Sequence, residues 1–136
     1  IAVVMFAIPG ATQASKTDAD ASDNIAVFST QKLAKLQSEG KPVFLYMTAD
    51  WCLSCKVNEA TSLSSPEVKD AFGKAGATVM RGDWTNGDPA ITAFLKENGK
   101  AGIPVYFWYS ADGKVTELPQ VLTPSLLLDL VHTPGG

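Results

Sequence analysis

The chain contains two cysteines, Cys52 and Cys55, which stand three positions apart in the stretch "TADWCLSCKVNE". A disulfide closed over two intervening residues would restrain little of the unfolded chain, because the closure entropy depends on loop length. Two cysteines are also too few for a disulfide-stabilised scaffold. We therefore predict that the pair serves chemistry, alternating between two thiols and one disulfide.

The chemistry of the pair depends on its position in the fold. The apolar run "PVFLYMTA" predicts a buried strand that ends at Thr48 or Ala49. A helix is expected to begin at or just before Cys52 and to run towards Leu63. Unpaired N–H groups and the helix dipole at that N-terminus would stabilise the Cys52 thiolate. We expect Cys52 to be the exposed attacking thiol and Cys55 the more buried thiol that resolves the mixed disulfide.

The same cysteine spacing also occurs in metal sites, where it supplies half of a zinc or copper(I) centre. A closed zinc site needs two more Cys or His ligands, and beyond the pair the chain offers only His132. We therefore assign no metal site. A two-coordinate copper(I) site needs only two soft thiolates, so a copper(I)-binding module is an alternative function.

Helix and strand signals alternate from Ile25 onward. Ser29 or Thr30 can cap a helix through about Ser38, with Ala26 counted among its apolar positions. Three further helices are predicted from a capping residue followed by proline, at Ser65-Pro66, Asp88-Pro89 and Thr123-Pro124. The other strands are "ATVMRGD" and a hairpin of "PVYFWYS" and "KVTEL" joined by "ADG". The order α-β-α-α-β-α-β-β-α predicts an α/β sheet sandwiched by helices.

Composition and charge favour one domain and exclude some partners. The chain has 136 residues, 46% of them hydrophobic, and a formal net charge of -3. This length can bury one core, and without a basic stripe neither nucleic acid nor an anionic membrane surface is indicated as a partner. We assign residues 25–136 to the domain. Residues 1–24, apolar and then rich in Ala, Ser, Thr and Asp, are interpreted as a truncated membrane-segment end or signal remnant plus a flexible linker, with an N-terminal strand as the alternative.

Two segments resemble a known family. "ADWCLSCK" is similar to the active-site segment of thioredoxin-fold proteins, and Ile103-Pro104 after Gly102 resembles their cis-proline segment. Together with "RGDWTNGDPAITAFLKENGKAGIPVYFWY", these residues most resemble the C-terminal periplasmic domain of DsbD-type transmembrane thiol:disulfide reductases, including their ScsB-like copper-tolerance branch. The resemblance covers about residues 25–132. It implies a thioredoxin fold, with a central mixed sheet flanked by helices and the cysteine pair at a helix N-terminus.

The resemblance also implies a function as a protein-disulfide reductase. The domain would take two electrons from a membrane-embedded cysteine pair and pass them to periplasmic disulfides, with the Cys52–Cys55 disulfide and no separate cofactor. Its partners would be the transmembrane and N-terminal domains of the parent protein and periplasmic thioredoxin-like or disulfide-containing proteins. It would lie in the bacterial periplasm, tethered to the inner membrane. A disulfide oxidase or isomerase carries the same motif and is the alternative function, in which electrons would flow in the opposite direction.

Three residues are expected to contact the partner polypeptide. Ile103 and Pro104, joined by a cis bond, would face the cysteines and hold backbone ready to pair with the substrate chain. Trp51 would shield Cys52 and supply contact surface, or would simply pack against the fold. The loop "DWTNGD", residues 83–88, is expected to lead into a capped helix rather than to dock a partner.

Three further residues are candidates for tuning the thiols. Glu59 lies on the helix face of both cysteines, where it can accept or relay the proton of Cys55, or be a plain exposed residue. Asp50 is expected to cap the helix, and its charge would also modulate Cys52. Tyr46 occupies the position, six residues before Cys52, where the family usually has a buried acid. A phenol with a reference pKa near ~10 is a poor base at neutral pH, so Cys55 is expected to deprotonate less readily.

Overall fold

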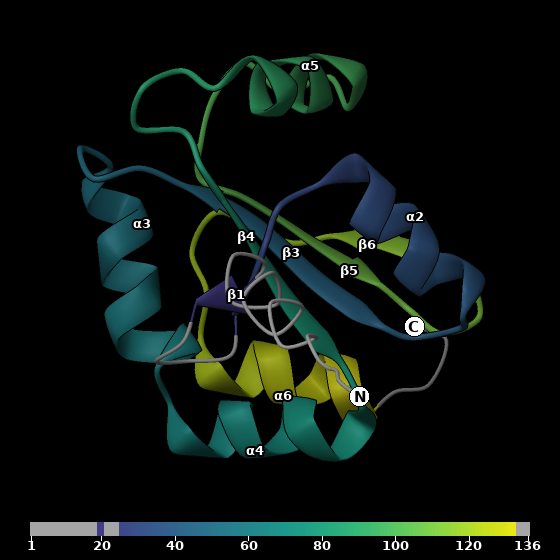
Figure 1. Cartoon of the computed structure of the whole chain (residues 1–136). Helices are drawn as coiled ribbons and strands as arrows, with labels where there is room; N and C mark the ends of the chain where they lie inside the picture. The colour runs from purple at the N-terminus through teal and green to yellow at the C-terminus, as the bar shows by residue number, and fades with distance from the viewer. Residues whose placement is uncertain (1–18, 21–24, 133–136) are drawn as a thin grey trace, which may run out of the picture.

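The computed structural model describes residues 19–20 and 25–132 (Figure 1). Its strands form one six-stranded sheet in the order β1-β2-β4-β3-β5-β6. They are β1 (Ala19–Asp20), β2 (Ile25–Val27), β3 (Val43–Thr48), β4 (Thr78–Asp83), β5 (Val105–Tyr109) and β6 (Val115–Glu117). β4 runs parallel to both β2 and β3, whereas β1, β5 and β6 each run antiparallel to a neighbour. The sheet is therefore mixed, as predicted.

Four of the helices begin directly after the capping residues predicted from the sequence. They are α2 (Thr30–Ser38), α3 (Leu53–Asn58), the π-helical segment η2 (Glu59–Leu63), α4 (Pro66–Ala75), α5 (Pro89–Glu97) and α6 (Pro124–His132). The side chains of Ser29, Ser65 and Asp88 accept backbone N–H groups in the first turns of α2, α4 and α5. Thr123 does the same at the start of α6, where its hydroxyl accepts the N–H of Leu126 at 3.2 Å. Each cap satisfies N–H groups that a helix start leaves unpaired.

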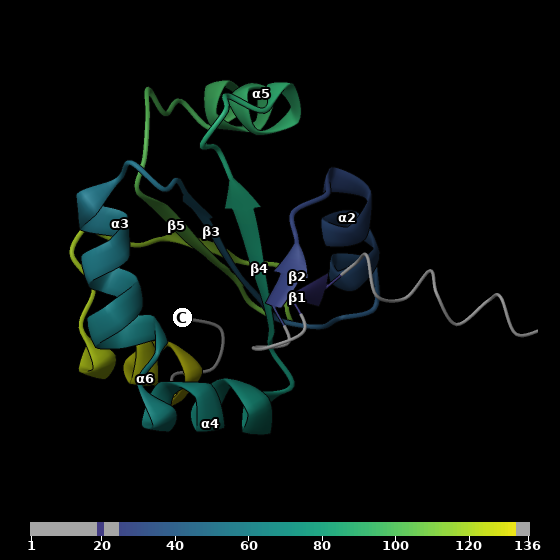
Figure 2. The same cartoon turned by 60° about the vertical axis from the view of Figure 1, so that its left-hand side comes forward.

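Alternate residues of β3 face two separate hydrophobic clusters. Val43, Leu45 and Met47 pack in the cluster that includes buried residues of α2 and α5. Phe44 and Tyr46 pack in the other cluster, with residues of α4 and α6. Because both faces of the strand are covered, every residue of β3 is buried and the strand reads as an unbroken apolar run. Figure 2 shows α2 on one side of the sheet and α4 and α6 on the other. The predicted thioredoxin-type α/β architecture is confirmed.

The N-terminal edge of the sheet differs from the prediction. Ala26 lies in β2, opposite Met80 of β4, and not in the first helix, because that helix begins only after the Ser29 cap. Neither β2 nor the two-residue β1 paired with it was expected, since such short segments carry no alternation. Residues 1–18 and 21–24, which hold most of the predicted membrane-segment remnant and linker, lie outside the described residues. No helix in the described part of the chain is long and apolar enough to cross a bilayer.

Candidate active site

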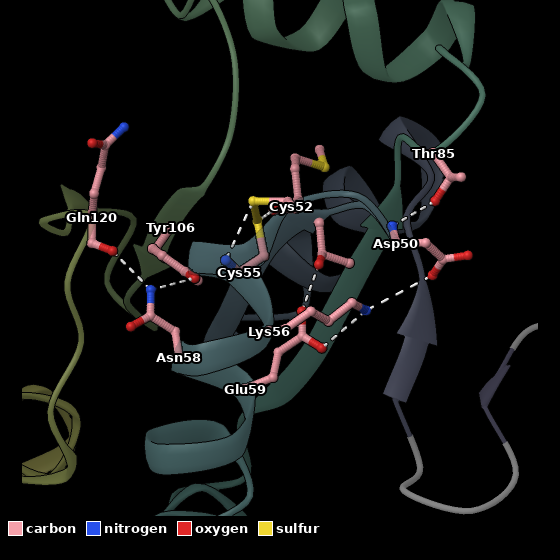
Figure 3. Close-up of a disulfide and its surroundings, with 11 residues drawn as sticks. Asp50, Cys52, Cys55, Lys56, Asn58, Glu59, Thr85, Tyr106 and Gln120 are labelled. Carbon is pink, nitrogen blue, oxygen red and sulfur yellow. Dashed lines mark hydrogen bonds and ion pairs between the residues drawn. A yellow bond between two sulfur atoms is a disulfide. The ribbon is translucent and has the colours of Figure 1, made fainter.

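Cys52 and Cys55 form a disulfide at the start of α3 (Figure 3). The helix begins at Leu53, and Cys52 is its N-cap residue, with extended backbone. The Cys52 sulfur accepts the backbone N–H of Cys55 at 3.3 Å. The sulfur therefore takes the place that a capping oxygen usually fills, and one N–H of the helix terminus is directed at it.

The two cysteines differ in burial in the predicted order. Cys55 is fully buried and Cys52 exposes 7% of its surface. The expectation of an exposed Cys52 is corrected, because in the disulfide form Cys52 packs in a small apolar cluster with Ala49 and Cys55. The Cys55 sulfur lies 4.0 Å from the carbonyl oxygen of Met47 on β3. Cys52 thus keeps a small exposed fraction, whereas Cys55 is enclosed.

The segment before β5 lies beside the cysteines. The Ile103–Pro104 peptide bond is cis, as predicted. Ile103 packs against the cluster that contains Cys52 and Cys55, and Pro104 is buried. Both residues line a cavity of about 240 Å³, together with Gln120 from the β6–α6 connection. The structure therefore brings the predicted Ile103-Pro104 segment next to the predicted cysteine pair.

Glu59 and Cys55 face successive residues of the same strand. The Glu59 carboxylate accepts a 2.5 Å hydrogen bond from the hydroxyl of Thr48, the residue after Met47. The Lys56 ammonium lies 3.5 Å from the same carboxylate and 3.9 Å from that of Asp50. Glu59 is partly buried, with 22% of its side chain exposed, so it is not a plain solvated helix residue. A carboxylate that is fixed by hydrogen bonds and still contacts solvent can accept a proton and transfer it to water.

Tyr46 lies on the same side of β3 as Glu59, and both line a cavity of about 340 Å³. Burial raises the pKa of Tyr46 to about 12, although the nearby Arg81 opposes the shift. Its ring stacks on that of Tyr106, with the centroids 6.2 Å apart. At neutral pH the phenol is therefore neutral and is a poor proton acceptor.

Trp51 and Asp50 lie on the exposed side of the site. Trp51 exposes 60% of its surface, and its indole N–H donates to the Thr85 carbonyl at 3.1 Å. Asp50 does not cap α3, because the helix begins at Leu53 and Cys52 itself takes the cap. The Asp50 backbone N–H instead donates to the Thr85 hydroxyl at 2.9 Å, as Figure 3 shows.

Sequence reasoning overlooked Asn58, one helical turn after Cys55. This buried amide donates to the Tyr106 hydroxyl at 2.8 Å and to the Gln120 carbonyl at 2.7 Å, and accepts the N–H of Leu122 at 3.1 Å. It ties the cysteine-bearing helix to the β6–α6 connection, as Figure 3 shows for Tyr106 and Gln120. The available signal was an asparagine three positions after Cys55, on the same face of the predicted helix.

Comparison with known proteins is consistent with this geometry. A family model described as thioredoxin-like matches residues 23–111. The chain belongs to the thioredoxin-like family. The thioredoxin from Thermus thermophilus shares the fold, with a TM-score of 0.61 at 19% identity over 79% of this chain and 85% of that chain.

The curated proteins similar to this chain include several named thiol:disulfide interchange protein DsbD. The thiol:disulfide interchange protein DsbD of Cronobacter sakazakii is 38% identical over 86 residues, which are 63% of this chain and 14% of that protein. The protein of the same name from Escherichia coli strain K12 is 34% identical over 87 residues, or 64% of this chain and 15% of that protein. The chain therefore corresponds to a small part of these relatives.

The solved structures similar to this chain include the C-terminal domain of DsbD. The reduced C-terminal domain of Neisseria meningitidis DsbD superimposes with a TM-score of 0.62 at 29% identity, covering 78% of this chain and 96% of that domain. Its oxidised form gives a TM-score of 0.60 at 28% identity, over 95% of this chain and 97% of that domain. The chain is thus a thioredoxin-like domain that resembles the DsbD C-terminal domain.

Proposed function

We propose that this domain exchanges thiols and disulfides through Cys52 and Cys55 and works as a reductase of the DsbD type. The observation that carries the proposal is the position of Cys52 as the N-cap of α3, where its sulfur accepts the Cys55 N–H. An N–H donor directed at the sulfur stabilises the thiolate, which is the nucleophile in disulfide exchange. The likeness to DsbD relatives and to the DsbD C-terminal domain supports the same chemistry.

The reaction has two exchange steps. The Cys52 thiolate attacks one sulfur of a substrate disulfide, which forms a mixed disulfide and releases the first substrate thiolate. Cys55 then loses its proton and attacks the Cys52 sulfur, which forms the Cys52–Cys55 disulfide and releases the second substrate thiolate. Two electrons pass to the substrate, and the released thiolates take up as many protons as the two cysteines lost.

Glu59 is our candidate for the group that receives the Cys55 proton. Its carboxylate is held by Thr48 and lies beside the strand that Cys55 faces. It also lines a cavity of about 340 Å³, through which water can exchange the proton with solvent. Tyr46, neutral with a pKa of about 12, leaves Glu59 to do this alone.

We propose a source and an acceptor of the electrons by analogy with the DsbD relatives. The electrons come from a membrane-embedded cysteine pair of the parent protein, and the acceptors are periplasmic proteins with disulfides. The domain lies in the periplasm, tethered to the inner membrane. The aligned residues span 14% of the Cronobacter sakazakii relative. Membership of the ScsB-like branch stays a prediction, and a disulfide oxidase or isomerase and a copper(I)-binding module stay alternatives.

The redox potential of the Cys52–Cys55 pair tests the proposal. The pair is equilibrated in graded dithiol and glutathione buffers, and free thiols are alkylated and counted. A reversible two-electron transition near the thioredoxin value, about -270 mV or somewhat higher, is expected for a reductive relay. A potential near about -120 mV would indicate an oxidase instead. Absence of any reversible transition would refute thiol–disulfide exchange, and tight copper(I) binding against a competing chelator would then favour the metal alternative.

A further inference from the structure

The loop between β4 and α5 is hydrogen-bonded to the segment that precedes Cys52. The Trp84 N–H donates to the Thr48 carbonyl at 2.7 Å. Thr85, the next residue, accepts two hydrogen bonds from this segment. Its hydroxyl oxygen accepts the backbone N–H of Asp50, and its carbonyl accepts the indole N–H of Trp51. From the sequence, this loop was predicted to have a structural role only. In the structure it contacts the residues that directly precede the attacking cysteine.

The Thr85 hydroxyl is itself held in one orientation. One carboxylate oxygen of Asp83 accepts both the backbone N–H of Thr85, at 2.9 Å, and the Thr85 hydroxyl hydrogen. Since a hydroxyl has a single hydrogen, its lone pairs remain for the Asp50 N–H. These hydrogen bonds lower the pKa of Asp83, so the carboxylate stays charged at neutral pH. Thr85 is therefore a preset acceptor rather than a freely rotating surface hydroxyl.

Trp51 is exposed and yet fixed in position. Its one polar atom is bound to Thr85, and its ring lies 6.2 Å from that of Trp84, at 51°. Trp84 is anchored in turn, because it packs against the core and its indole N–H donates to Thr92 at 2.9 Å. With Leu53, which exposes 78%, Trp51 places apolar surface on both sides of Cys52 in the sequence.

We propose that Thr85 is a positioning residue that holds Trp51 as a preset contact for the polypeptide around a substrate disulfide. The inference rests on the proposed disulfide exchange and adds a determinant of substrate recognition. A mobile side chain loses conformational entropy when a partner fixes it. Because Trp51 is already ordered before the partner arrives, binding does not bear that cost. Thr85 then governs recognition of protein disulfides, whose flanking residues reach Trp51. Small disulfides have no such residues, so their reduction depends on the cysteine pair alone.

The test compares Thr85→Val, which keeps the shape but removes the hydroxyl, with Thr85→Ser, which keeps the hydroxyl. Asn86→Ala, in the same loop and exposed, is the matched control. Each reduced protein is assayed against insulin, a protein disulfide, and against oxidised glutathione. Thr85→Val loses the hydroxyl's hydrogen bonds to the Asp50 N–H and to the Asp83 carboxylate. These bonds hold the Thr85 carbonyl in place for the Trp51 indole. We therefore expect Thr85→Val to raise KM for insulin about fivefold. Its kcat and its rate with glutathione disulfide are expected to match wild type, and Thr85→Ser and Asn86→Ala to match wild type throughout.

Other outcomes are decisive as well. An unchanged KM for insulin in Thr85→Val would overturn the proposal, and so would equal slowing with both substrates, which would place Thr85 in the cysteine chemistry. If the wild-type domain reduces neither substrate, the proposed function itself fails. If Thr85→Val does not fold, Trp51→Phe removes the indole N–H together with part of the exposed ring, and an unchanged KM for insulin in that variant overturns the proposal.

Discussion

The Thr48 hydroxyl donates a 2.5 Å hydrogen bond to the Glu59 carboxylate, one residue after the Met47 carbonyl that faces the Cys55 sulfur. This contact fixes a carboxylate near the strand that encloses the resolving thiol. In the proposed exchange, this carboxylate is the candidate acceptor for the proton of Cys55.

Glu59→Gln should slow resolution of the mixed disulfide by about tenfold, less than the usual effect of a general base because the group keeps contact with water. The rate should recover only at higher pH, where Cys55 deprotonates without help. Stopped-flow measurement of mixed-disulfide decay against pH provides the check. Thr48→Val keeps the carboxylate but removes its hydrogen bond, so a smaller effect is expected. Superimposable pH profiles for Glu59→Gln and wild type would exclude Glu59 as the proton acceptor.

The two cysteines should give different phenotypes when replaced. Cys52→Ala should abolish exchange, whereas Cys55→Ala should still attack and should accumulate mixed disulfides, because the resolving thiol is missing. Neither change should cost much stability, since the disulfide closes over only two residues. Non-reducing electrophoresis after incubation with a protein disulfide detects the adducts. A Cys55→Ala protein that traps no partner would reverse or refute these roles.

Asn58→Leu should lower the free energy of unfolding by about 2–4 kcal/mol, because it removes three hydrogen bonds of a buried group and leaves the Leu122 N–H without its acceptor. Urea unfolding followed by far-UV circular dichroism measures the loss. Asn86→Ala, at an exposed position, is the control and should change stability by less than about 0.5 kcal/mol. A loss no larger than that of the control would show that Asn58 does not hold α3 in place.

The chain's three tyrosines should all resist ionisation at the usual pH near ~10. Burial raises the pKa of Tyr46 and Tyr109 to about 12, and it raises that of Tyr106 as well. Because the folded pKa values exceed the unfolded ones, this contribution to stability is fully present below pH ~10 and is lost as pH rises towards 12. Absorbance of phenolate during alkaline titration should therefore rise together with unfolding. A phenolate step near pH 10 in the folded protein would contradict the burial of these rings.

The features that the sequence determined alone are those that depend on neighbours along the chain. The spacing of Cys52 and Cys55 and the cap-then-proline pairs rest on contacts within a single helical turn, so residue type and order suffice to predict them. The apolar run of β3 was equally readable, because both faces of the strand are buried. A small difference in where α3 begins still changed the capping residue. Because α3 begins at Leu53, its N-cap residue is Cys52 and not the predicted Asp50.

Only the tertiary structure decided which polar residues surround the pair. Thr48 meets Glu59 across 11 positions, Asp50 meets Thr85 across 35, and Asn58 meets Gln120 across 62. Such pairs have no local signature, since a threonine or asparagine that serves a distant partner looks like any other polar residue in the sequence. They form because β3 and β4 lie side by side and Asn58 of α3 reaches Tyr106 of β5. The chain follows this path because it buries two hydrophobic clusters against one sheet. The cysteines define the reaction, and the folded chain supplies the contacts that position and tune them.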